Sequence, residues 1–363
     1  MKKRIIVMVG VIALLACSAS AQKLELPKLD PTPSTEKQTD LIKEGVALHD
    51  RGDYDCAVSR YEEVLRENPN NISALYEMSY SYFMKKDYQK SLATAYRAAQ
   101  YKSNVLSDVY VMIGNCFDEL GESRKAIETY KTGIKLLPPN FFLHYNLAVT
   151  YNRAGQLDEA RVAVKRSAAM NPEHASSQLL LSTLFDKGSY KTPALLAGCR
   201  FLILEPASQR SDTALRLVGK TMQAGVSPGK NANEINIFLD TSPQKKDEGD
   251  FSSIDVFMGL ARAANYTEKN KNRTEMQLLV ANFDSLFAFL SESTSKADRS
   301  KFTWQYYVPY FVEMKNKGHV EAFAYYINQR GSTHGVDEWL QRNQNQVSEF
   351  LTWSKNYQWP KID

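Results

Sequence analysis

The sequence predicts an all-α fold, in which a solenoid of about five helix–turn–helix repeats is followed by a C-terminal helical domain. Small residues recur about every 34 positions, and each is followed by another small residue twelve positions later. A fixed period of this length is typical of solenoids, whose units bury their apolar faces only against their neighbours. In the last hundred residues, apolar side chains spaced three and four apart predict further helices. The repeated small pairs are Gly45 and Ala57, Ser79 and Ser91, Gly114 and Ala126, Ala148 and Ala160, and Ser182 and Ala194.

The chain begins with a pattern that predicts a signal peptide over residues 1–21. Three basic residues precede an apolar run from Ile5 to Ala16, and small residues follow it. This order is that of a secretory leader, so we expect cleavage between Ala21 and Gln22 and an exported, periplasmic protein. The apolar run is shorter than the roughly 20 residues that span a bilayer.

A second interpretation of the leader remains open. The sequence from Leu14 to Cys17 resembles a bacterial lipobox, in which Cys17 would carry the lipid. The protein would then be a membrane-anchored lipoprotein, and Cys17 would provide its only expected contact with a membrane.

Removal of the leader lowers the formal net charge from +4 to about +1, because the leader holds three basic residues and no acidic one. No stripe of basic residues interleaved with aromatic ones follows it. A nearly neutral chain without such a stripe is not expected to bind nucleic acid.

A Pro-rich linker is expected over residues 22–37, and the repeat array over residues 38–206. In the first repeat, Gly52 marks the turn between two helical stretches and Pro69 marks the end of the second, because proline lacks the N–H that a continuing helix needs. The small pairs allow the two helices to cross at a separation of about 8 to 10 Å. The turn recurs at Gly121 and Gly155, and the stop at Pro138, Pro172 and Pro206.

These repeats resemble the tetratricopeptide repeat family, most clearly in repeats three and four. The resemblance implies a right-handed solenoid that binds a protein or peptide without catalysis, in a concave groove lined by the first helix of each unit. Repeat five departs from the pattern at Pro193, Gly198 and Phe201, so we expect it to abut something different, with a capping helix over residues 207–226. Repeat three reproduces the motif with Tyr110, Ile113, Gly114, Phe117, Gly121, Ala126, Tyr130 and Pro138.

The resemblance also implies which side chains line the groove. Their aromatic character favours an extended or helical apolar segment as the partner, with Asn115 and Asn152 bonding its backbone. The alternative is that several of these aromatic rings form core between repeats. The implied groove residues are Tyr76, Tyr80, Phe83, Met112, Asn115, Phe142, Tyr145 and Asn152.

A linker over residues 227–253 separates the array from an aromatic-rich helical C-terminal domain over residues 254–363. Aromatic rings at helical spacing are most often core, and the alternative is a cage for a ligand. The aromatic residues include Trp304, Tyr306, Tyr307, Tyr310, Trp353, Tyr357 and Trp359. This region does not resemble a family of known activity.

No catalytic motif, cofactor motif or metal-ligand spacing is found, so no enzyme activity, cofactor or metal is expected. The leading hypothesis is a non-enzymatic, exported scaffold that binds a protein or peptide partner in the bacterial envelope. The alternatives are a lipid-anchored structural component of an envelope assembly, and an enzyme or carbohydrate-binding module in residues 254–363. Reduced, packed thiols are expected at Cys56, Cys116 and Cys199.

Overall fold

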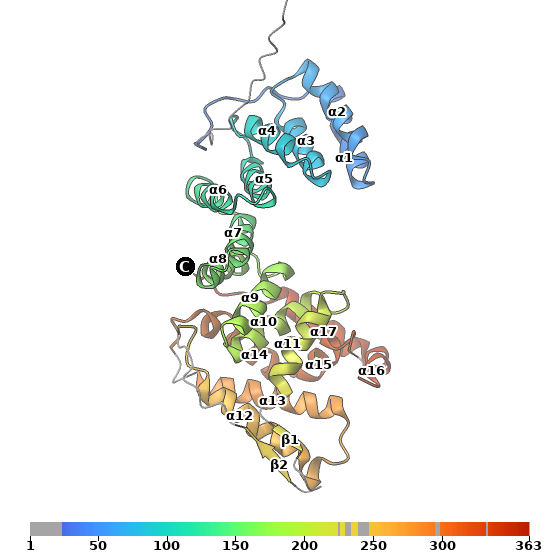
Figure 1. The fold of residues 1–363 in the computed structure, drawn as a ribbon. Helices are drawn as coiled ribbons and strands as arrows, with labels where there is room; N and C mark the ends of the chain where they lie inside the picture. The colour runs from blue at the N-terminus through green and yellow to red at the C-terminus, as the bar shows by residue number, and fades with distance from the viewer. Residues whose placement is uncertain are drawn as a thin grey trace, which may run out of the picture.

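The computed structural model describes residues 24–223, 226–228, 234–238, 247–294, 298–331 and 333–362. Paired helices stack into an array, and further helices pack against its C-terminal end (Figure 1). The all-α solenoid with a C-terminal helical region is therefore confirmed. The leader residues Cys17, Ala21 and Gln22 lie outside the described residues, so cleavage and lipidation stay predictions.

Ten helices form the array, two in each of the five repeats, within the part of the chain that the structure describes. Asp53, Asn71 and Asp87 begin helices by accepting a hydrogen bond from a backbone N–H three residues later. The helices are α1 (Glu36–Asp50), α2 (Tyr54–Glu67), α3 (Ile72–Met84), α4 (Tyr88–Ala98), α5 (Leu106–Glu119), α6 (Ser123–Leu136), α7 (Phe141–Arg153), α8 (Leu157–Met170), α9 (Ala175–Lys187) and α10 (Lys191–Leu204).

The turn between the two helices of each repeat contains one residue with positive φ. Gly52, Gly121 and Gly155 have φ of +81°, +78° and +76°, values that glycine adopts without steric cost. Repeats two and five hold the same left-handed turn with Lys86 and Ser189, at φ of +63° and +65°. The predicted stops are also confirmed, because Pro69, Pro138, Pro172 and Pro206 each follow the last helical residue by two positions.

The small pairs lie where the two helices of each repeat cross, and all ten of these residues are buried. A Cβ atom added at Gly114 would lie 2.2 Å from the Tyr130 ring on the second helix of the same repeat. Two of the serines bond to the backbone of the other helix: Ser91 donates to the Ser79 carbonyl at 2.7 Å, and Ser182 donates to the Ala194 carbonyl at 2.8 Å. The small residues are therefore required by the partner helix and its aromatic ring.

Beyond the array, α11 (Ser211–Gln223) packs against α9 and α10, within the range expected for a capping helix. A two-stranded antiparallel ribbon follows, formed by β1 (Val226–Pro228) and β2 (Ile235–Ile237), which the sequence analysis did not anticipate. The C-terminal helices are α12 (Ser252–Ala263), α13 (Glu275–Ser293), α14 (Phe302–Asn316), α15 (Val320–Ile327), α16 (Val336–Arg342) and α17 (Gln344–Asn356), with short 3₁₀ turns at Ala264–Tyr266 and Glu268–Asn270.

Repeat five is continuous with the C-terminal helices. Every residue of α10 from Thr192 to Ile203 is buried, because α12, α14 and α15 pack against this helix in addition to its neighbours in the array. One apolar core therefore runs from the second repeat into the C-terminal region. The departures of repeat five from the repeat pattern are explained by these contacts: Gly198 lies against Ser182 and Val218, and Phe201 is fully buried.

A buried charge cluster connects the segment before α12 to repeats four and five. Glu248 is 2% exposed and forms ion pairs with Lys165 and with Arg161, whose Nε lies 3.4 Å from its carboxylate. The neighbouring Asp247 accepts hydrogen bonds from Tyr190 at 2.6 Å and Arg161 at 3.1 Å. These contacts hold Asp247 and Glu248 against α8.

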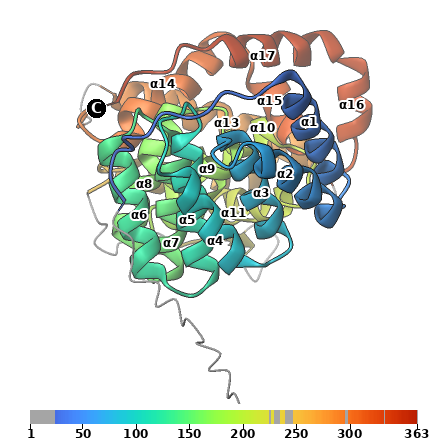
Figure 2. The same ribbon diagram turned by 90° about the horizontal axis from the view of Figure 1, so that it is seen from above.

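The residues that precede α1 lie along the array (Figure 2). Leu29 forms a parallel β-bridge with Tyr101, and its carbonyl accepts the Lys102 N–H at 2.8 Å. Tyr110 donates to the Glu25 carbonyl at 3.0 Å, and the Asn68 amide donates to two carbonyls near residue 32. Residues 24–34 thus run from α1 toward α5 and contact three successive repeats.

The three described cysteines differ in exposure: Cys116 and Cys199 are buried, whereas Cys56 is exposed. The expectation of packed thiols is therefore wrong for Cys56, which lies in the first turn of α2 on the outside of the array. Burial raises the pKa of Cys116 to about 11 and also raises that of Cys199.

We expect thiol reagents to distinguish these positions. At about pH 8, the native chain from Gln22 onward should react at Cys56 before the other two thiols, because Cys56 is exposed and they are buried. A hydrogen bond with Asp53 raises the pKa of Cys56, so its thiol should still react more slowly than a free cysteine. Unfolding in urea should make all three accessible. Labelling with a chromogenic disulfide measures this, with Cys56→Ser as the control that removes the first phase. A second thiol that reacts in this phase in the native protein would contradict the burial of Cys116 and Cys199.

Candidate functional site

The first helices of the repeats form the inner side of the array. Within repeats one to four, α1 contacts α3, α3 contacts α5 and α5 contacts α7, whereas the corresponding second helices contact one another less. Stacked units that approach more closely on one side curve toward that side. The concave surface is therefore built from α1, α3, α5 and α7, the helices that carry the predicted groove residues.

Three of the predicted residues lie on α3. Tyr80 is 38% exposed, and Tyr76 and Phe83 are half-buried. The Tyr80 ring packs against His49 of α1, with 4.5 Å between the ring centroids. His49 Nδ1 lies 2.8 Å from Ser81 Oγ, and burial lowers the pKa of His49. The imidazole is therefore neutral at physiological pH and serves as a fixed support for Tyr80.

A second aromatic group lies on α7. Phe142 is 41% exposed, and its ring centroid is 4.1 Å from that of Phe141. Tyr145 is half-buried and packs edge-on against His174, at a centroid distance of 4.8 Å. Burial lowers the pKa of His174, so this ring is also neutral near pH 7. The group exposes one face of Phe142 and holds Tyr145 in place.

The remaining predicted residues are less available. Met112 on α5 is 5% exposed and belongs to the core. Tyr76 and Tyr145 each stand three positions before a small residue, and in repeat three that position is occupied by the half-buried Val111. Met112 stands one position later, on a face of α5 that the neighbouring helices cover.

The two predicted asparagines are already engaged through their amide oxygens. Asn115 Oδ1 accepts a hydrogen bond from Tyr130 at 2.7 Å, and Asn152 Oδ1 accepts one from Lys187 at 3.0 Å. Each amide can therefore offer a partner only its N–H groups, which would donate to backbone carbonyls.

The structure thus brings the predicted residues into two aromatic groups, on α3 and on α7, with α5 between them. Sequence reasoning did not include Phe141 and His174 in the second group. His174 stands 34 positions after Asn140, the residue that caps α7, so the repeat register places it at the start of α9. That register is the signal by which it could have been found.

The aromatic residues of the C-terminal region are mainly core, as predicted. Trp304 is 4% exposed, and Tyr306, Tyr307 and Tyr310 are fully buried. Trp359 stacks on Tyr310 with 4.9 Å between ring centroids, so the last residues of the chain cover this core.

The described residues contain no candidate metal cluster and no candidate membrane-spanning helix. None of their histidine, cysteine, aspartate and glutamate side chains cluster in groups of three that could hold a metal ion. None of their helices combines the length and the apolar character needed to cross a bilayer.

Models of the tetratricopeptide repeat family match residues 42–104, 107–140 and 129–162, which run from α1 to α8. The chain is 30% identical over 116 residues to the general transcriptional corepressor trfA of Dictyostelium discoideum. The aligned residues make up 31% of this chain and 8% of that protein. It is 25% identical over 142 residues to the BBSome complex member bbs-4 of Caenorhabditis elegans. Here the aligned residues make up 38% of this chain and 31% of that protein. It therefore spans less than a third of the length of either relative.

Solved structures similar to the chain include a tetratricopeptide repeat protein of Thermus thermophilus, at 20% identity and a TM-score of 0.42, over 50% of this chain and 97% of that one. Another is PilW, a type IV pilus biogenesis factor, at 15% identity and a TM-score of 0.45, over 51% of this chain and 88% of that one. Three observations agree: the repeat register, the packing of small residues against aromatic rings where the helices cross, and the three family matches. Residues 42–162 are tetratricopeptide repeats and belong to that family.

Proposed function

We propose that this protein is a non-enzymatic, exported scaffold that binds a protein or peptide partner of the bacterial envelope in the concave groove of its repeat array. The observation that carries the proposal is the exposure of Tyr80 and Phe142 on α3 and α7, the inner helices. Large aromatic side chains held on a rigid surface are typical anchors for a partner segment. The signal-peptide pattern of residues 1–21 supports export.

The two aromatic groups fit a segment that presents apolar side chains at two separated points. His49 and His174 hold Tyr80 and Tyr145 by ring contacts, so little side-chain entropy is lost when a partner binds. The amide N–H groups of Asn115 and Asn152 lie on α5 and α7 and would donate to the partner's backbone. Arg153 and Asp118 form an ion pair along the same helices, which adds a charged border to the surface.

The groove is tested by replacing one exposed ring from each group. Tyr80→Ser together with Phe142→Ser should weaken partner binding about tenfold or more, because each ring buries apolar area against the ligand. Phe142 is a better choice than Tyr145, because the Tyr145 ring also packs within the protein. The partner is first isolated by affinity capture from envelope extract, and its affinity for each variant is then measured by calorimetry.

Leu260→Ser provides the matched control, because Leu260 is an exposed apolar residue on α12, outside the array. Circular dichroism should show unchanged helicity for both proteins. Equal affinity of the double variant and the control would refute binding at the aromatic groove.

A further inference from the structure

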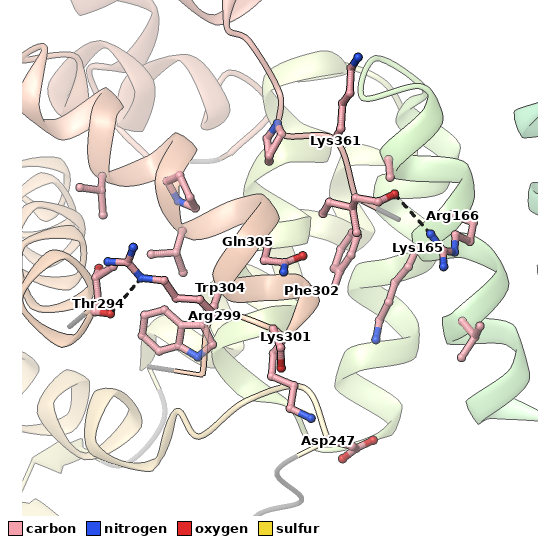
Figure 3. A pocket seen from close by; sticks show the side chains of 18 residues that line it. Lys165, Arg166, Asp247, Thr294, Arg299, Lys301, Phe302, Trp304, Gln305 and Lys361 are labelled. Carbon is pink, nitrogen blue, oxygen red and sulfur yellow. Dashed lines mark hydrogen bonds between the residues drawn. The ribbon is translucent and has the colours of Figure 1, made fainter. Parts of the chain in front are cut away.

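A cavity of about 870 Å³ opens between α8, the start of α14 and the C-terminal tail (Figure 3). Its volume lies in the range of sites for small molecules. α8 is a second helix of its repeat, so the cavity is distinct from the concave groove. Apolar side chains form part of its wall: Val162, Ala169, Phe302, Val308, Val312 and Ile362.

The polar part of the wall is mainly cationic. Lys165 from α8 and Lys301 from the start of α14 line the cavity from opposite sides and point toward the segment that holds Asp247, whereas Lys361 points the other way (Figure 3). Arg166 and Arg299 also line the cavity and donate to the carbonyls of Ile362 and Thr294. Among the described residues, neither arginine has a carboxylate within ion-pair distance.

The negative charges near the cavity are already engaged. Asp247, the acidic residue of its wall, accepts hydrogen bonds from Tyr190 and Arg161. Glu248 pairs with Lys165, while Lys301 lies 3.9 Å from the exposed Asp298. Within the part of the chain that the structure describes, the cavity wall therefore carries an excess of positive charge.

The start of α14 adds unused hydrogen-bond donors to this cationic wall. The N-cap position is occupied by Lys301, which makes no capping hydrogen bond, and the first turn contains no acidic residue. A cation at a helix N-terminus is unfavourable, because the exposed N–H groups and the helix dipole attract negative charge. An anion in the cavity would compensate for both features.

Trp304 adds to the apolar part of the wall. Its side chain is 4% exposed, and its ring stacks on Phe251 with 4.7 Å between the ring centroids. Its indole Nε1 lies against Gly249 and is not exposed to the cavity.

From these observations, we propose that the cavity binds an organic anion that carries an apolar portion. Its anionic group would lie near Lys165, Lys301 and the start of α14, where the Gln305 amide also faces the opening (Figure 3). Its apolar portion would contact Phe302 and Val308. This proposal does not depend on a partner in the concave groove.

The test uses the full mature chain and four probes: octanoate, octyl phosphate, inorganic sulfate and the neutral amphiphile octyl glucoside. Calorimetry should show binding of octanoate or octyl phosphate at least about tenfold tighter than that of sulfate or octyl glucoside. Comparison of the affinities of the two anionic amphiphiles shows whether the cavity prefers a carboxylate or a phosphate.

Two substitutions locate the binding. Val162→Glu introduces a carboxylate four residues before Arg166 on the exposed part of the wall, since Val162 is 63% exposed. It should weaken binding of the anionic amphiphile about tenfold relative to Val162→Gln, which has the same shape without the charge. Lys301→Gln should weaken the same binding and leave any binding of octyl glucoside unchanged.

Equal binding of all four probes, or no binding of either anionic amphiphile, would overturn the proposal. It would also be overturned if Val162→Glu and Lys301→Gln both bound the anionic amphiphile as tightly as the unmodified chain. Because Val162 is exposed, its two variants keep the test valid even if Lys301→Gln is poorly folded.

Discussion

Replacing Arg200 with alanine is expected to lower the free energy of unfolding by about 3 kcal/mol, the size typical of emptying a buried site of this volume. Arg200 lies on α10 and is 1% exposed. Its guanidinium packs against the rings of Tyr310 and Trp359, which stack on each other, at 5.3 and 4.9 Å from their centroids. The alanine variant would lose both ring contacts and leave a cavity between the array and the C-terminal helices.

The polar contacts of Arg200 add to this loss. Arg200 donates to Ser354 Oγ at 3.1 Å, to the Pro172 carbonyl at 3.4 Å and to the Glu173 carboxylate. Ser354 belongs to α17, whereas Pro172 and Glu173 lie before α9. One side chain therefore joins three segments that are far apart in the sequence.

Three variants separate these contributions in urea unfolding. Arg200→Met keeps much of the side-chain volume and should cost about 1 to 2 kcal/mol, from lost hydrogen bonds alone. Arg216→Ala, on the exposed face of α11, should change stability by less than about 0.5 kcal/mol. In the Arg200→Ala protein, a protease should also cleave the residues after Tyr357 faster, because Trp359 loses its contact with the guanidinium. If the Arg200→Ala and Arg216→Ala proteins were equally stable, Arg200 would not be what joins the array to the C-terminal helices.

The array was predictable because the information for each repeat lies within it. Gly114, the turn at Gly121 and the stop at Pro138 fall within one unit and recur in others, so local patterns place both helices and their crossing. Repeat two has Lys86 in place of glycine at the turn, and Lys86 still adopts the left-handed conformation that this position requires.

The groove residues were less predictable because burial depends on neighbouring units. Tyr80 and Phe142 are exposed, whereas Met112 is covered, although all three lie on first helices. The spacing between equivalent positions of α3 and α5 is 35 residues instead of 34. The residue of α5 equivalent to Tyr76 is therefore Val111, one position before the predicted Met112.

The contacts between distant segments could not be predicted from local patterns. The β-bridge of Leu29 with Tyr101 and the pairing of Glu248 with Lys165 each depend on where a non-repeating segment packs. Repeat five gave an indirect signal, because Gly198 and Phe201 break the motif where other helices cover α10.

The crossing of the two helices in repeat three allows a second strong prediction. Gly114→Leu should lower the free energy of unfolding by up to about 3 kcal/mol, because its side chain would occupy the space of the Tyr130 ring. Tyr130 is 1% exposed and its hydroxyl is held by Asn115, so the ring cannot move aside without losing that hydrogen bond. The overpacked helices would have to separate.

A glycine elsewhere in the chain provides the matched control. Gly219 lies inside α11, and a Cβ added there would meet nothing within 4 Å. Gly219→Leu should therefore be neutral or stabilising by up to about 1 kcal/mol, because glycine is a poor helix former. Destabilisation of the same size at both positions would mean that lost backbone flexibility, and not the Tyr130 ring, is responsible.

A double-variant cycle with Tyr130→Ala isolates the contact itself. Tyr130→Ala alone should cost about 3 to 5 kcal/mol, because it empties a buried aromatic site. In the Gly114→Leu, Tyr130→Ala protein, the leucine would partly fill the space that the ring leaves, so the two costs should not add. The measured coupling should be at least about 1 kcal/mol in the stabilising direction, as expected for residues in direct contact. Additive costs in urea unfolding would contradict the packing of Gly114 against Tyr130, and with it the reason that a small residue recurs at this position in every repeat.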